Sequence, residues 1–345
     1  MLGASVASVP EKLTCLDVSG VSGVSGVSGG MVFGGFHGGV YVLEASSGAS
    51  AVPVKIREFW DPLSFLRVGA EGSGLGLGLG LDSGREVVAG EWSGWVTVNT
   101  KRTKVSERPI KYVRQAGAKL LVSDASCLYL VGSGVESTLD IGTYALEIAV
   151  YGEVFVCITG YTVVWVSVGG GKLVRGETLD IHGLTENTET ITCLARAGSD
   201  YVGGTIGGWL VYLRNLDDPS ETRVDRVMKV SSERITDILA FSEGQVRYYL
   251  CTSLNAVHIV RPDLKKVIST LVLTQSNGLF GVRLHNAAKH LFSVADVNCQ
   301  VHIVDASGVF GLVRECLPST PQTVSRSAAS VYDDLLNEIN AGAYD

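Results

Sequence analysis

The chain has 345 residues, of which 46% are hydrophobic and 18% charged, so it can bury a large core, and disorder of the whole chain is excluded. Its net charge is −7, and no Lys/Arg cluster is long enough to form a phosphate-binding stripe. Direct binding to nucleic acid is therefore not expected, and a basic or extended peptide is a better partner.

The first residues, MLGASVASVPEKL, lack the basic start and apolar core of a signal peptide. No window of ~18 uninterrupted apolar residues follows anywhere in the chain. We therefore expect a soluble protein in the nucleus and/or the cytoplasm, with no membrane partner. Residues 1–9 are assigned to an N-terminal segment that precedes the repeats.

From residue 31 onward one pattern recurs seven times: a β-rich run, a tight polar or glycine turn, and an alternating apolar run. The 42 glycines, most of them beside short apolar runs, agree with many turns between strands. Successive copies are 56, 32, 36, 47, 46 and 44 residues apart, which is the period of four-stranded propeller blades. The copies span 31–43, 86–98, 119–131, 154–166, 200–213, 248–260 and 290–304.

An apolar run that fits the inner strand of a blade stands upstream of these copies, at 13–18, 63–68, 110–115, 145–150, 191–197, 235–241 and 279–284. Seven inner strands and seven hairpins predict an all-β fold, a seven-bladed β-propeller over residues 10–317. Whether the N-terminal segment or a local last strand closes the ring is left open.

Two glycine-rich stretches, 21–30 and 69–84, are low-complexity loops between the first and second strands of their blades. Both should project from the same face of the ring, so we expect partners to use the other face. The GSGLGLG stretch is not a phosphate-binding loop, because no helix and no Lys-Ser/Thr pair follows it.

The last residues, 318–345, form a Ser/Thr/Pro linker followed by a short acidic amphipathic helix. Val331, Leu335 and Ile339 repeat at a spacing of four residues, and Ser330 with Asp333 resembles a helix start. This tail would dock on the propeller, bind a partner, or stay mobile.

The seven cysteines stand in or beside apolar runs without a Cys-x-x-Cys pair, which favours free, mostly buried thiols. The six histidines show no metal-ligand spacing, and His258 and His302 share one position of the repeat. No serine elbow and no catalytic carboxylate pair stands out. No metal, no cofactor and no enzymatic activity are therefore expected.

Large side chains stand in or next to the turns between second and third strands, where a propeller places one mouth of its channel. Exposed rigid aromatics in such a place are what peptide anchoring requires. Trp95 and Trp209, already inside the third strand, would instead pack between blades. The predicted peptide-binding residues are Phe36, His37, Trp92, Tyr161 and Ile206.

Over residues 10–317 the pattern resembles the WD-repeat family, with degenerate repeats. Trp165 and Asp305 stand where a blade's closing Trp-Asp would lie, and Asp124 and Asp296 resemble its hairpin aspartates. Residues 144–166, 177–180, 191–197 and 200–220 are most similar to the mitotic-checkpoint propeller and its mRNA-export relative, which bind the GLEBS peptide motif. Phe36 matches the first aromatic that holds the peptide in that group, whereas Ala125 replaces the second, a tryptophan.

The resemblance implies a non-enzymatic scaffold that binds short linear peptide motifs, as a mitotic-checkpoint adaptor at the kinetochore or an mRNA-export adaptor. The chain would be a monomer within a larger complex. The alternative is a permanent structural subunit of a coat, nuclear-pore or cytoskeletal assembly, which predicts a large exposed apolar flank.

Overall fold

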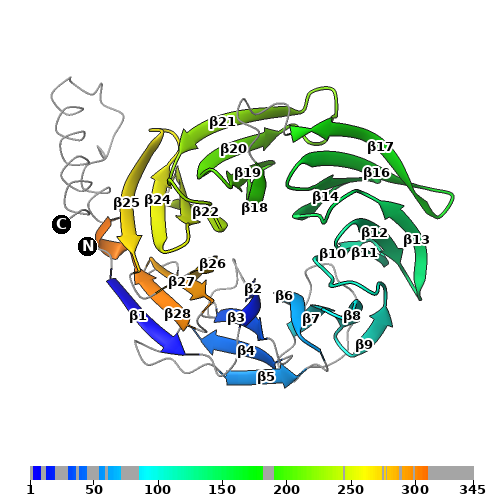
Figure 1. Ribbon diagram of the computed structural model, residues 1–345, viewed down its shortest axis with the longest axis horizontal. Helices are drawn as coiled ribbons and strands as arrows, with labels where there is room; N and C mark the ends of the chain where they lie inside the picture. The colour runs from blue at the N-terminus through cyan, green and yellow to red at the C-terminus, as the bar shows by residue number, and fades with distance from the viewer. Residues whose placement is uncertain are drawn as a thin grey trace.

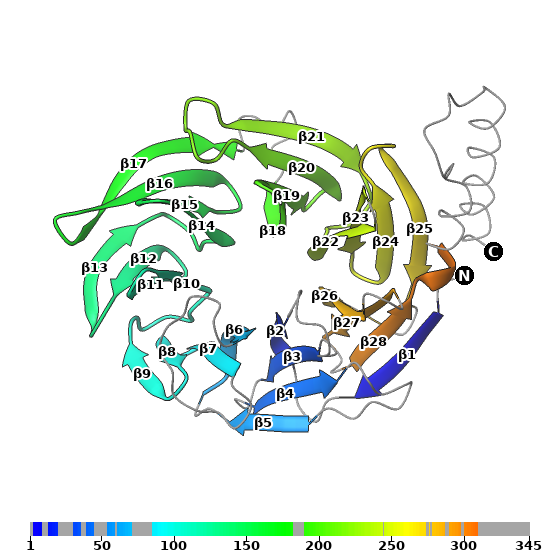
Figure 2. The same ribbon diagram turned by 180° about the vertical axis from the view of Figure 1, so that it is seen from behind.

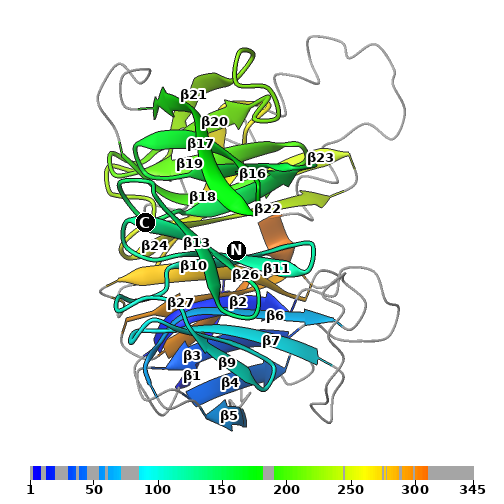
Figure 3. The ribbon, with the colours of Figure 1, turned by 90° about the vertical axis from the view of Figure 1, so that its right-hand side faces the viewer.

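The fold is a ring of antiparallel sheets, seen in a computed structural model from its two faces in Figures 1 and 2 and edge-on in Figure 3. The structure describes residues 3–8, 13–19, 30–35, 39–44, 54–58, 61–70, 85–181, 190–243, 245–273, 276, 278–286, 290–297 and 300–309. These residues form seven four-stranded sheets, in which every neighbouring pair of strands is antiparallel. In the six sheets made of four consecutive strands the first strand lies nearest the centre of the ring, and in the remaining sheet β26 does (Figure 1).

Six of the sheets are blades made of four consecutive strands, and we number them in chain order. Blade 1 consists of β2 (Leu13–Ser19), β3 (Gly30–Gly35), β4 (Gly39–Glu44) and β5 (Val54–Glu58). Blade 2 consists of β6 (Leu63–Ala70), β7 (Arg85–Glu91), β8 (Trp95–Val98) and β9 (Lys101–Lys104). Blade 3 consists of β10 (Tyr112–Ala116), β11 (Lys119–Ser123), β12 (Cys127–Val131) and β13 (Val135–Asp140).

The next three blades follow the same order from the inside of the ring to the outside. Blade 4 consists of β14 (Glu147–Tyr151), β15 (Val154–Ile158), β16 (Thr162–Gly169) and β17 (Lys172–Asp180). Blade 5 consists of β18 (Ile191–Ala197), β19 (Asp200–Thr205), β20 (Trp209–Arg214) and β21 (Arg223–Lys229). Blade 6 consists of β22 (Asp237–Glu243), β23 (Val246–Thr252), β24 (Ala256–Arg261) and β25 (Lys266–Val272).

The remaining sheet, which we call the closing sheet, combines strands from both ends of the chain. Its inner three strands are β26 (Leu279–Asn286), β27 (Leu291–Asp296) and β28 (Gln300–Asp305). Its outermost strand is β1 (Gly3–Ser8), which pairs with β28 from Gly3 opposite Asp305 to Ser8 opposite Gln300. The N-terminal strand therefore closes the ring, which was one of the two possibilities left open by the sequence.

The prediction of a seven-bladed β-propeller followed by a C-terminal acidic helical tail is thus wrong in two respects. Only six blades are complete within one stretch of chain, and residues 3–8, expected to precede the propeller, supply the last strand of the composite sheet. The tail helix is not supported: among the described residues the chain ends in a single helical turn at 307–309, and 318–345 lie outside them.

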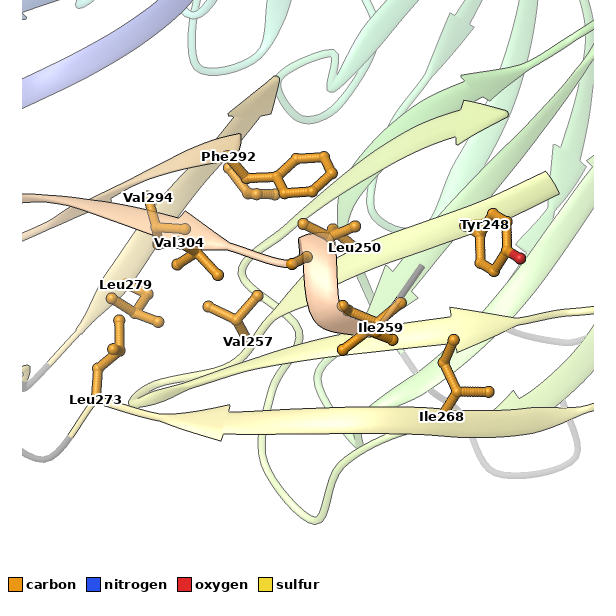
Figure 4. Packing of buried hydrophobic residues seen from close by; sticks show 13 residues of the cluster. Tyr248, Leu250, Val257, Ile259, Ile268, Leu273, Leu279, Phe292, Val294 and Val304 are labelled. Atoms are coloured by element: carbon orange, nitrogen blue, oxygen red, sulfur yellow. The ribbon is translucent and has the colours of Figure 1, made fainter. Parts of the chain in front are cut away.

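The core consists of apolar layers between neighbouring sheets. Figure 4 shows the layer between blade 6 and the closing sheet, where Leu250 and Val257 face Phe292 and Val304. All four side chains are fully buried. The alternating inward positions of each strand supply these layers, since successive side chains of a strand point to opposite faces.

Polar contacts also join neighbouring inner strands. Asp237 of β22 forms an ion pair with Arg283 of β26 and accepts a hydrogen bond from the amide of Val282 at 2.9 Å. The Tyr112 hydroxyl of β10 donates to the Glu147 carboxylate of β14. These links join the inner strands of adjacent sheets around the ring.

Candidate functional site

Among the described residues, one face of the ring carries the turns between second and third strands, which we call the hairpin tips. Because the strands of a sheet are antiparallel, the connection from each outer strand to the next inner strand reaches the same edge. We call this side the tip face. The strand ends that flank the two glycine-rich stretches, Ser19 with Gly30 and Ala70 with Arg85, lie at the other edge.

Backbone hydrogen bonds fix each of four tips to the start of the next sheet's inner strand or to the residues just before it. The amide of Ile110 donates to Glu91 O at 3.2 Å, and that of Ile235 donates to Thr205 O at 3.1 Å. Two other tips make the same link, from the Ile191 amide to Gly160 O and from the Leu279 amide to Leu254 O. These four tips are therefore held by hydrogen bonds to the next sheet rather than being free loops.

The tips of blades 2 and 5 both contain a glycine with a positive φ angle. Gly94 and Gly208 have φ values of +83° and +77°, and each carbonyl accepts two amide hydrogen bonds from the residues that follow its own outer strand. A Cβ on Gly208 would lie 2.1 Å from Ser231 O, and one on Gly94 would lie 1.9 Å from Ser106 O. Only glycine meets both requirements at these positions.

Large apolar side chains stand exposed at the tips. Trp92 is 46% exposed, Tyr161 is 47% exposed and Ile206 is 56% exposed, so three of the predicted binding residues lie on the surface of the tip face. Their roles in binding remain predictions. Phe36 and His37, between β3 and β4, lie outside the described residues.

Two further residues belong to this group, although they were not among the predicted binding residues. Leu254 at the tip of blade 6 and Val297 at the tip of the closing sheet are also exposed. The Val297 amide donates to Gly278 O at 2.9 Å, and Leu279, next to Gly278, donates to Leu254 O, so one short segment joins both tips. Their position at the turn in each repeat copy was the available signal.

Blade 3 differs from the others because its tip carries Ala125 and no large side chain. The Asp124 carboxylate lies buried beneath this tip and accepts hydrogen bonds from the hydroxyls of Ser106 at 2.6 Å and Tyr129 at 2.8 Å. Burial acts to raise the pKa of Asp124, but these bonds and those from two backbone amides lower it overall. Burial raises the pKa of Tyr129 to about 12.

The exposed surface of the blade 3 tip is basic. Arg108, in the connection that enters this blade, donates from Nη1 to Ser126 Oγ at 2.9 Å, which holds the guanidinium against the tip. Arg108 and Lys111 are both exposed. At this tip a positioned cation takes the place of an apolar side chain.

Trp95 and Trp209 are partly buried and support the tips. The Arg102 guanidinium lies 4.4 Å from the centre of the Trp95 ring and also pairs with the buried Glu91 carboxylate at 2.5 Å. Glu91 in turn accepts a hydrogen bond from the Thr97 hydroxyl. This Glu-Thr-Arg network occupies the edge of blade 2 that carries the tip.

His258 and His302, which share one position of the repeat, each form a hydrogen bond with a residue at the tip of their own sheet. His302 Nε2 lies 2.9 Å from Asp296 Oδ2, and His258 Nε2 lies 3.3 Å from Ser253 Oγ. Burial lowers the pKa of His258 to about 4. Within the described ranges no three His, Cys, Asp or Glu side chains are grouped so as to hold a metal ion.

Four cysteines have described side chains, and all four are free thiols. Cys157, Cys193 and Cys251 are buried, and Cys127 is half-buried. Burial raises the pKa of Cys157 to about 12 and raises those of Cys193 and Cys251 as well. Among the helical residues that the structure describes, none belongs to a helix long and apolar enough to cross a membrane.

Comparison with known proteins agrees with this architecture. No protein-family profile matches the sequence, and no curated protein matches it. Among solved structures 1183 chains match, which defines the architecture but not a subfamily. What these matches show is the β-propeller fold.

One of these structures is the WD40 β-propeller domain of Doa1. It superposes with a TM-score of 0.62 at 9% sequence identity, over 88% of this chain and 97% of that domain. At this identity the similarity is one of fold alone. The expected resemblance to checkpoint and mRNA-export propellers is not supported by the comparisons.

Proposed function

We propose that the protein is a non-enzymatic interaction scaffold that binds short extended segments of partner proteins across its tip face. One observation carries the proposal. Of the six tips with at least one described residue, five present an exposed large apolar side chain: Trp92, Tyr161, Ile206, Leu254 and Val297. A few side chains at the centre of an interface, most often Trp, Tyr and Arg, supply most of the binding energy, and a rigid support lowers the entropic cost of binding.

The arrangement of these side chains favours an extended ligand over a compact one. They stand on the tips of blades 2, 4, 5 and 6 and of the closing sheet, around one mouth of the ring, so a segment that crosses the mouth contacts several of them in turn. Tyr161 and Ile206 are joined through Thr190 and Ile191, whose backbone groups bond to both tips. A partner would therefore meet the anchors in a fixed order.

The narrower role, a mitotic-checkpoint or mRNA-export adaptor in the nucleus and/or the cytoplasm, is part of the proposal and rests on the sequence resemblance in blades 4 and 5. We further propose that the chain acts as a monomer within a larger complex, without nucleic acid or membrane as a direct partner. Ala125, at the tip where that group has its second tryptophan, argues for a different peptide preference.

The test compares partner binding by surface variants of the whole chain. Proteins captured from native extract are divided into overlapping synthetic segments, and the affinity of each segment is measured by fluorescence anisotropy. We expect one short segment to retain binding, and Ile206→Asp to weaken it at least tenfold. Val174→Asp is the matched control, because Val174 is exposed to a similar degree, 47%, at the other edge of the ring.

A second control removes residues 22–29 and 72–82, which should leave binding unchanged, since those stretches connect strand ends at the other edge. If Ile206→Asp binds like Val174→Asp, the tip face is not the recognition surface. If instead no isolated segment binds and the chain is insoluble without its partner, the permanent structural subunit is the correct function.

A further inference from the structure

We infer that the tip face recognises segments that combine apolar side chains with a carboxylate, and that the carboxylate binds at Arg108 and Lys111 of blade 3. This inference rests on the proposed function and adds the chemistry of the partner. It concerns the one described tip that lacks a large apolar side chain.

The local charge of this surface differs in sign from that of the whole chain. Between residues 104 and 111 the chain carries Lys104, Arg108 and Lys111 against Glu107, a net charge of +2 (3 − 1). The Glu107 carboxylate lies 2.9 Å from the Lys104 ammonium, so this acid already has a partner of its own. The chain as a whole has a net charge of −7.

The nearby Asp124 carboxylate makes its hydrogen bonds with groups other than the exposed cations Arg108 and Lys111. It is fully buried, and its two oxygens accept hydrogen bonds from Ser106, Tyr129 and the amides of Ser126 and Cys127. Arg108 is instead held by the Ser126 hydroxyl, which leaves most of the five guanidinium N–H donors directed elsewhere. A guanidinium fixed at a rigid tip is suited to a carboxylate, which it can bind through two parallel hydrogen bonds.

The position of this cation relative to the apolar tips sets an order along the ligand. Tyr161 of blade 4 and Ile206 of blade 5 follow blade 3 around the ring, and Trp92 of blade 2 precedes it. A segment that places a carboxylate on blade 3 thus has apolar contacts on both sides. Asp or Glu next to bulky apolar residues is the corresponding sequence pattern.

The test uses a phage-displayed library of random 12-residue peptides selected on the full chain. Selected peptides are synthesised, and their affinities are measured by fluorescence anisotropy at low and high ionic strength. We expect selected peptides to contain Asp or Glu beside apolar residues, and their affinity to fall as salt rises. The double variant Arg108→Glu/Lys111→Glu should lose at least tenfold in affinity.

Controls separate this inference from the proposed function. Lys172→Glu changes an exposed lysine at the other edge of the ring and should bind like the unchanged protein. Replacing the peptide's acid by its amide, Asp by Asn or Glu by Gln, should reproduce the loss on the unchanged protein. The inference is overturned if Arg108→Glu/Lys111→Glu binds like Lys172→Glu while Ile206→Asp still loses affinity. If no peptide is selected, or Ile206→Asp has no effect, the proposed function itself fails.

Discussion

Trp209 and Lys229 stand opposite each other on β20 and β21, and the Lys229 ammonium lies 5.4 Å from the centre of the Trp209 ring. The same pair recurs in blade 2, where the Lys104 ammonium lies 5.8 Å from the Trp95 ring. In both blades the lysine also donates a hydrogen bond to a carbonyl of the tip. These tryptophans therefore brace the tips, whereas Trp92 is exposed on the surface that they support.

Trp92→Ala should weaken partner binding by roughly 1–3 kcal/mol, about tenfold to a hundredfold, and barely change the melting temperature. Trp165→Ala is the matched control, because Trp165 is buried and donates from Nε1 to Leu216 O at 2.9 Å. Its truncation should destabilise the fold by about 3–5 kcal/mol. Both quantities are measured on both variants, and Phe36→Ala should behave like Trp92→Ala. Early melting of Trp92→Ala with normal residual binding would assign that residue to packing.

Gly208→Ala should lower the free energy of unfolding by more than Gly117→Ala. Both glycines have a positive φ, +77° and +61°, which costs an alanine roughly 1–2 kcal/mol. A Cβ at Gly117 meets nothing within 4 Å, whereas one at Gly208 would meet Ser231 O. Overpacking adds about 1–3 kcal/mol in such a case. Urea unfolding of the two variants measures the difference in unfolding free energy. Equal losses in the two variants would show that the tip of blade 5 accommodates the added Cβ without a further loss of stability.

A thiol reagent at pH 8 should label Cys127 before the other three described cysteines. The thiolate is the reactive form, and burial both shields Cys157, Cys193 and Cys251 and raises their pKa values. After denaturation without reductant, all seven cysteines of the chain should react. Mass spectrometry identifies the labelled sites. Fewer than seven labelled cysteines after denaturation would reveal a disulfide and would contradict a reducing compartment.

The free energy of unfolding should decrease as the pH is lowered, because His258 becomes protonated. Burial lowers the pKa of His258 from 6.5 to about 4, so between these pH values the unfolded chain binds a proton that the folded chain does not bind. The contribution of the neutral imidazole is fully present above pH ~6.5 and lost as pH falls to about 4, with a limit on the order of 3 kcal/mol. The difference in unfolding free energy between the unchanged protein and His258→Gln, measured from pH 7 to 4, isolates this contribution. A difference that does not vary with pH would contradict it.

The sequence predicts local features of this fold well, because each depends on a short repeated pattern. The apolar run 191–197 coincides with β18, and Asp124 and Asp296 lie at hairpin turns as the resemblance implied. The pairing of β1 with β28 was not predictable in the same way. The six residues GASVAS carry little apolar signal, and their partner lies about 300 residues away, beyond any local period.

The candidate site was predicted in part for a similar reason. Trp92 and Tyr161 could be selected because aromatics at turns are conspicuous, whereas Leu254 and Val297 became visible only when their exposure was known. The basic tip of blade 3 depends on the contact between Arg108 and Ser126, which are 18 residues apart in the sequence. Contacts of this kind require the structure.

The pairing of β1 with β28 also constrains how the protein is made. During synthesis β1 leaves the ribosome about 300 residues before the strand that it pairs with, so the first strand to emerge is the last to find its place. Until then β1 is an unpaired strand, and once synthesised β28 exposes a free edge of the kind that promotes association between chains. The nascent ring thus stays open at least until β28 has been synthesised, and a chaperone that shields residues 3–8 would favour closure within one chain over exchange of β1 between two.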